Sequence, residues 1–128
     1  DPRGRIVDEA DRFAMRAKAV QDDAIVQGRV MRLRIDASGY AVEQRGQGRW
    51  QAATGRPFSP VSWKPGTTVS SGGSAVFDPT GAIAEPITID LRRDAAAVRV
   101  TLTASRPRSV APDTASHFRS VPPNTASR

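Results

Sequence analysis

The sequence predicts an α+β fold in which one long N-terminal amphipathic helix packs on antiparallel β-sheets. Three observations support this prediction. Residues 6–27 contain no Pro or Gly and have helical periodicity, residues 30–103 form short alternating runs separated by turn residues, and periodicity ends at residue 105. A chain of 128 residues suffices for one domain. We therefore expect residues 1–104 to form one domain and residues 105–128, rich in Pro and Ser, to be a disordered tail.

The expected helix, residues 6–27, has one apolar stripe. Six residues recur along it in alternating steps of four and three: Ile6, Ala10, Phe13, Ala17, Val20 and Ala24. The opposite side is expected to carry the charged residues Asp8, Glu9, Arg12, Arg16, Asp22 and Asp23. Gly28 is suited to ending the helix. Because half of the stripe is Ala, a sheet can approach the helix axis closely, and we expect this helix to be the core partner of all the sheet.

An antiparallel meander is expected next. Three runs, residues 30–36, 40–44 and 49–52, alternate apolar and polar side chains, as half-buried strands do. The turn between the first two ends at Gly39, which we expect to supply a positive φ. Tyr40 is expected to lie on the buried face.

The middle of the chain mixes irregular and extended segments. Residues 53–66 contain three Pro and two Gly residues, a composition that predicts irregular chain rather than sheet. Phe58 and Trp63 are expected to hold this segment against the body. Two short runs, residues 67–70 and 75–78, flank Ser-Gly-Gly-Ser and predict a hairpin.

A second long hairpin is expected after a β-turn. Residues 78–81 read Asp-Pro-Thr-Gly, a typical β-turn sequence. Residues 83–92 and 97–103 then alternate around apolar Ile, Leu and Val, and Pro86 favours an edge position or the start of a strand.

No chemical signature of an enzyme is present. The chain has no Cys, and its single His, His117, lies in the expected tail, where no third group would orient it as a base. No spacing of acidic residues matches a metal site, and Gly72-Gly73 lacks the Lys-Ser/Thr of a phosphate-binding loop. The sequence therefore predicts no enzyme activity, no cofactor, no metal and no small-molecule substrate.

The charge leaves two interpretations open. The formal net charge is +6 and the sequence pI is about 11.2, with the excess spread over the strands and the tail. One interpretation is a soluble, Arg-rich surface. The other is an anionic partner such as nucleic acid or lipid head groups, and Arg106 and Arg108, directly after the last expected strand, are the candidate nucleic-acid contacts.

No apolar run approaches the roughly 20 residues of a transmembrane helix, and no signal peptide is apparent. The chain begins without Met, so we expect a processed form or a piece of a longer protein whose first helix continues upstream.

Several motifs occur in the order found in one family. Residues 9–29 read EADRFAMRAKAVQDDAIVQGR, residues 32–45 read RLRIDASGYAVEQR, and residues 48–51 read GRWQ. RPF at residues 56–58 and FDPTGAIAEPITIDLRR at residues 77–93 follow. Over residues 5–104 the chain resembles the H-type minor pseudopilins of the bacterial type II secretion system, within the GspH/FimT-like pseudopilin family.

The resemblance implies a pilin-like fold and a structural role. It implies a single-pass anchor in the inner membrane through an N-terminal helix half that this sequence lacks, with the present domain as a soluble periplasmic head. Its partners would be the other major and minor pseudopilins, assembled into a short pseudopilus that supports export of folded proteins across the outer membrane.

A second function belongs to the same family. FimT-like minor pilins of type IV pili bind DNA for uptake, through a Gly-Arg-x-Arg element near the C-terminus. Here the corresponding residues are Ser105-Arg106-Pro107-Arg108, so the leading Gly is absent. Nucleic acid is a partner only under this alternative.

Overall fold

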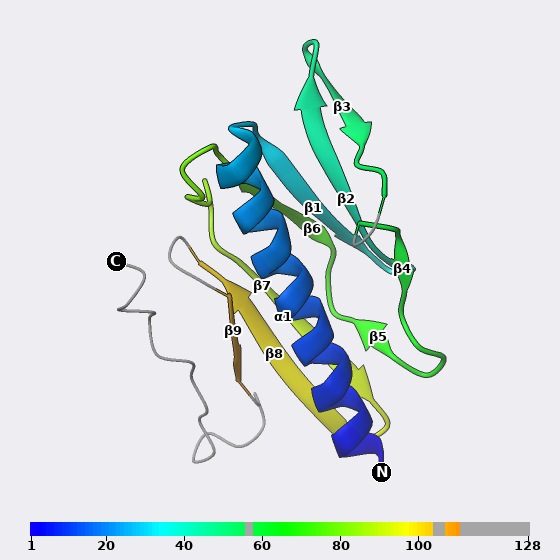
Figure 1. Ribbon diagram of the computed structural model, residues 1–128. Helices are drawn as coiled ribbons and strands as arrows, with labels where there is room; N and C mark the ends of the chain where they lie inside the picture. Colours follow the sequence, from blue (N-terminus) through cyan, green and yellow to red (C-terminus); the bar gives the residue numbers. More distant parts are fainter. Residues whose placement is uncertain (56–57, 104–106, 111–128) are drawn as a thin grey trace.

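The computed structural model describes residues 1–55, 58–103 and 107–110, which form one helix and two antiparallel sheets (Figure 1). The helix α1, Pro2–Gln27, lies against both sheets and runs in roughly the same direction as β8 in the view of Figure 1. The first sheet has the strand order β3-β2-β1-β6, with β4 also paired to β2, and the second has the order β5-β7-β8-β9. The predicted α+β class, with one N-terminal helix on antiparallel sheets, is therefore confirmed.

Helix α1 begins four residues earlier than the sequence predicts. Asp1 caps it, because its carboxylate accepts a hydrogen bond from the backbone N–H of Arg3 at 3.3 Å. Pro2 is tolerated in the first turn, where its missing N–H has no helical partner to lose. The predicted end is confirmed: Gly28 adopts φ 64°, and its N–H donates to the carbonyls of Ala24 and Ile25.

The core lies between α1 and the two sheets. All six residues of the apolar stripe are 0 % exposed, and they form one cluster with buried side chains from both sheets. Phe13 is the large residue at its centre: its ring lies edge-on to Tyr40, with centroids 5.1 Å apart, and 6.0 Å from Trp63. Two polar residues, Glu9 and Gln21, are also buried on α1, which contradicts the expectation that Glu9 lies on the charged side.

The first sheet contains the predicted meander. Its strands are β1 (Met31–Asp36), β2 (Gly39–Gly46), β3 (Arg49–Ala52), β4 (Val61–Ser62) and β6 (Gly73–Phe77). Strand β4 lies inside the segment predicted to be irregular. It pairs Val61 with Tyr40, and this long-range contact is not visible in local composition.

Gly39 has a different role from the one the sequence predicts. Its φ is not positive; instead, a Cβ at this position would clash with the carbonyl of Val61 on β4. The turn before it is held by Asp36, whose carboxylate accepts from the hydroxyl and N–H of Ser38 and from the N–H of Gly39. The Ser38 hydrogen bonds stabilise the ionised carboxylate and lower the pKa of Asp36.

The second sheet consists of β5 (Thr68–Val69), β7 (Ile87–Arg93), β8 (Ala96–Leu102) and β9 (Pro107–Val110). The β7–β8 hairpin confirms the predicted second hairpin, although its first strand begins only after Pro86. Strand β9 pairs with β8 inside the range predicted to be a tail. A Pro can begin such an edge strand because no ladder N–H is required of it there. The rest of the predicted tail, 105–106 and 111–128, lies outside the described residues.

The predicted hairpin around Gly72 and Gly73 is wrong. Strand β5 pairs with β7 in the second sheet, whereas β6 pairs with β1 in the first, so this segment crosses between sheets. A Cβ on Gly72 would lie 2.6 Å from the carbonyl oxygen of Ile35, and one on Gly73 would lie 2.7 Å from Ile87. Gly72 therefore allows close approach to the backbone of β1, and Gly73 allows close approach to β7 of the second sheet.

Candidate functional site

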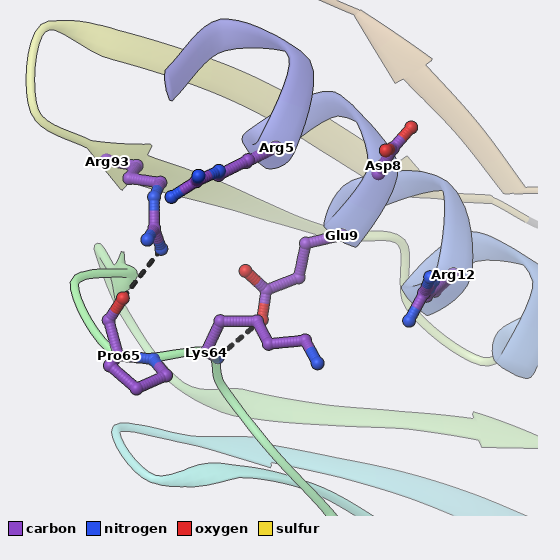
Figure 2. A pocket seen from close by; sticks show the side chains of 7 residues that line it. All are labelled: Arg5, Asp8, Glu9, Arg12, Lys64, Pro65 and Arg93. Carbon is purple, nitrogen blue, oxygen red and sulfur yellow. Dashed lines mark hydrogen bonds between the residues drawn. The ribbon is translucent and has the colours of Figure 1, made fainter. Parts of the chain in front are cut away.

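A cleft of about 390 Å³ lies beside the N-terminal half of α1 (Figure 2). Its lining comes from three parts of the chain: α1, the loop between β4 and β5, and the end of β7. The lining residues are Arg5, Asp8, Glu9, Arg12, Lys64, Pro65 and Arg93. Arg5, Asp8 and Arg12 are spaced by three and four residues, which places them on one side of the helix.

A buried carboxylate forms the floor of this cleft. Glu9 is 7 % exposed and accepts hydrogen bonds from the backbone N–H of Lys64 at 2.8 Å and from the hydroxyl of Thr67 at 2.7 Å. Arg93 donates from Nη1 to the carbonyl of Pro65 at 2.7 Å and to the Thr67 hydroxyl at 3.2 Å. These bonds fasten the loop to α1 and β7, so the cleft has fixed walls.

A second hollow, of about 570 Å³, lies near the other end of α1. It is lined by Ala19, Asp22, Asp23, Val26, Gln27, Arg29, Gln44, Ala53, Thr54 and Phe58. Asp22 is already paired with Lys18 at 2.6 Å, and Val26 is 78 % exposed. The predicted packing role of Phe58 fits its partly buried position against the core.

Polar anchoring occurs at this end of α1 too. The side-chain amide of Gln21 donates to the carbonyl of Gly81 at 2.8 Å, and this bond is buried. Gly81 closes the predicted β-turn, in which its N–H donates to the carbonyl of Asp78 at 2.8 Å. Thr80 donates to the Asp78 carboxylate through both its hydroxyl and its N–H, which lowers the pKa of Asp78.

The outer face of the first sheet combines Arg with Trp. The guanidinium of Arg32 lies 4.3 Å from the centroid of the Trp50 ring, and that of Arg45 lies 5.2 Å from it. Arg32 is also ion-paired with Glu43 on the neighbouring strand. Because two guanidinium groups already contact the Trp50 ring, this cluster stabilises the β1–β2–β3 meander and offers little open aromatic surface.

The structure describes neither side chain of the two predicted nucleic-acid contacts. Arg106 lies outside the described residues. Arg108 lies in β9, opposite Thr101 on β8, and the placement of its side chain is not described. The buried positions of Glu9 and Gln21 were not predicted, although their spacing indicates them. Glu9 is three residues after Ile6 and four before Phe13, and Gln21 is four residues after Ala17 and three before Ala24.

Metal and membrane signals are absent from the part of the chain that the structure describes. Within residues 1–55, 58–103 and 107–110, no three His, Cys, Asp or Glu side chains gather in a way that could hold a metal ion. Helix α1, in that same part, is not apolar enough to cross a bilayer.

Solved structures share this fold. The minor pseudopilin EpsH from the type 2 secretion system of Vibrio cholerae superposes with a TM-score of 0.71 at 20 % identity, over 84 % of this chain and 98 % of that one. A second EpsH structure gives 0.72 at 17 % identity, over 86 % and 96 % of the two chains. The type IV minor pilin FimU of Pseudomonas aeruginosa gives 0.65 at 12 % identity, over 83 % and 88 %. At these identities the likeness shows the pilin-like fold alone.

Sequence comparison shows the family. Among curated proteins, none matches the chain significantly. The family model described as type II transport protein GspH matches residues 9–106, which span α1 from Glu9 onward and the strands β1 to β8. The predicted resemblance is thereby confirmed, and the chain belongs to the GspH family of type II transport proteins.

Proposed function

We propose that this chain is the periplasmic head of a minor pseudopilin and acts as a structural subunit of the type II secretion pseudopilus. The observation that carries the proposal is the match of residues 9–106 to the GspH family, on a fold shared with minor pseudopilins. The family is one of structural pseudopilins, anchored in the inner membrane by an N-terminal helix.

The architecture suits an assembly subunit. Helix α1 is buried along one stripe by both sheets, while Asp8, Arg12 and Met15 on its other side are exposed, Met15 by 71 %. The helix is therefore available on one side to neighbouring subunits, which we propose are the other major and minor pseudopilins. The two hollows beside α1 lie along this available side.

DNA binding through Arg106 and Arg108 remains a prediction. The net charge of +6 favours it, but Arg32 and Arg99 on the two sheets are held in ion pairs, and Arg32 also lies against Trp50, so these strands present no continuous row of free cations. A phosphate backbone is best bound by a continuous row of cations. We therefore retain the pseudopilin role as the proposed function.

A gene deletion tests the proposal. We expect a deletion strain to retain type II substrates in the periplasm, and the full-length gene to restore their export. Normal export in the deletion strain would contradict the proposal. If export were normal while DNA uptake was lost, the type IV pilin alternative would replace it.

A further inference from the structure

The cleft beside α1 is lined by more positively charged side chains than negatively charged ones. Arg5, Arg12, Lys64 and Arg93 line it, against the two carboxylates of Asp8 and Glu9. Among the described residues, none accepts a hydrogen bond or forms an ion pair with the side chains of Arg5, Arg12 or Lys64. All three side chains are exposed, so their N–H groups are available to a ligand.

The two carboxylates do not neutralise this excess. Both oxygens of Glu9 are already used by Lys64 N–H and the Thr67 hydroxyl. The carboxylate of Asp8 is exposed and points away from Glu9, whereas the side chain of Arg5 extends toward Arg93 and that of Lys64 toward Arg12 (Figure 2). The cleft therefore presents three cationic side chains that have no partner among the described residues, whereas the Glu9 carboxylate on its floor is already hydrogen-bonded at both oxygens.

The positive charge and the apolar stems of the lining side chains indicate which kind of ligand fits the cleft. A group that only accepts hydrogen bonds and carries negative charge fits the free guanidinium and ammonium groups, and a carboxylate matches the guanidinium fork. The aliphatic stems of Arg5, Arg12 and Lys64 and the ring of Pro65 provide apolar walls for the carbon chain of such a group. A volume of about 390 Å³ accommodates an inserted side chain and not a folded element.

We propose that this cleft receives an acidic side chain, Glu or Asp, of a neighbouring pseudopilin head. The inference rests on the proposed function and adds to it a named contact surface and the charge of the partner. Charge complementarity is its basis: the cleft has an excess of two positive side chains. The hydrogen bonds from Thr67 to Glu9 and from Arg93 to Thr67 hold the loop that forms its wall. Binding therefore costs little conformational entropy in this loop.

The test measures binding between this chain and each of the other pseudopilin heads of the same secretion system. The cleft variant is Arg5→Gln/Arg12→Gln, which keeps polar side chains and removes two positive charges. The control variant is Arg49→Gln/Arg92→Gln, which makes the same charge change at two exposed arginines that do not line the cleft. Circular dichroism checks that both variants are folded.

The expected result is one head that binds the wild-type chain and loses about tenfold or more in affinity with the cleft variant. With the control variant the affinity should change less than about twofold, and raising the salt from about 50 to about 200 mM should weaken the wild-type complex more than the cleft-variant complex. Reversing one acidic residue of that head to Arg should then restore binding to an Arg12→Glu chain.

Other results overturn the inference. Equal losses of affinity in the cleft variant and the control variant would indicate only general charge attraction. If no head bound the wild-type chain, the proposed partner would be rejected. Loss of short-duplex DNA binding or of self-association specifically in the cleft variant would assign the cleft to nucleic acid or to a second copy. A deletion strain that fails to export while the cleft variant complements it fully would retain the proposed function and reject the cleft contact.

Discussion

Two polar residues on α1 connect the helix to loops that lie far away in sequence. Glu9 binds the β4–β5 loop through Lys64 and Thr67, and Gln21 binds the turn at Gly81. Buried polar groups are costly unless they are hydrogen-bonded, and both of these have partners. They therefore determine where the loops dock, a task that the apolar stripe cannot perform because hydrophobic contact is not directional.

Removing the Glu9 carboxylate should loosen the loop. We expect Glu9→Ala to lower the free energy of unfolding by about 1–3 kcal/mol, because the Thr67 hydroxyl and the Lys64 N–H lose their acceptor. Asp8→Ala, one residue away and exposed, is the control and should change it by less than about 0.5 kcal/mol. Urea denaturation measures both, and equal effects would show that Glu9 does not hold the loop.

Phe13 should be the most sensitive position of the stripe. It contacts Tyr40 and Trp63 and is 0 % exposed. We expect Phe13→Ala to cost about 3–5 kcal/mol in denaturant melts, because it removes buried surface and leaves a cavity. Met15→Ala, at a side chain that is 71 % exposed, should be nearly neutral. A loss below about 1 kcal/mol at Phe13 would mean that α1 does not pack on the sheets as described.

At the scale of elements, the segment between β5 and β6 decides how the two sheets are joined. Short strands around Ser-Gly-Gly-Ser are compatible with a local hairpin, which is what the sequence predicts. The observed pairing is non-local, with β6 beside β1 and β5 beside β7. The local sequence pattern could not distinguish the hairpin from the observed pairing, because strand pairing also depends on which strand edges are unpaired in the folded molecule.

A side chain at Gly72 should disturb this crossing. The Cβ of Gly72→Ala would lie 2.6 Å from the Ile35 carbonyl oxygen, so the backbone of β1 or of the crossing must shift. We expect a loss of about 1–3 kcal/mol in the free energy of unfolding. Ser71→Ala, at the exposed neighbouring position, serves as the control. An unchanged midpoint for Gly72→Ala would refute the close approach.

At the scale of the whole molecule, one helix serves as the core partner of two sheets. Residues of α1, of the first sheet and of the second sheet belong to a single buried cluster. Neither sheet has another helix among the described residues to cover its apolar face. The stability of each sheet is therefore coupled to the other through α1.

This coupling predicts a single unfolding transition. Both Trp residues report on the first sheet, because Trp50 lies in β3 and Trp63 packs against Phe13 and Tyr40, whereas far-ultraviolet circular dichroism reports mainly on α1. We expect the two signals to change together in urea, as for a two-state domain of this size. A fluorescence transition at distinctly lower urea than the loss of helix would contradict the coupling.

Five features are predictable from the sequence alone: the helix, its apolar stripe, the first meander, the β-turn at Asp78 and the second long hairpin. Each depends on residues that are close together in the chain, so the spacing of apolar residues and the turn residues suffice to predict it. Only the three-dimensional fold shows four further features: the crossing at Gly72, the pairing of β4 and β9, the hydrogen-bond partners of Glu9 and Gln21, and the basic cleft beside α1. These features depend on contacts between distant segments, such as Glu9 with Thr67, and no local periodicity encodes which distant acceptor or edge a residue will meet.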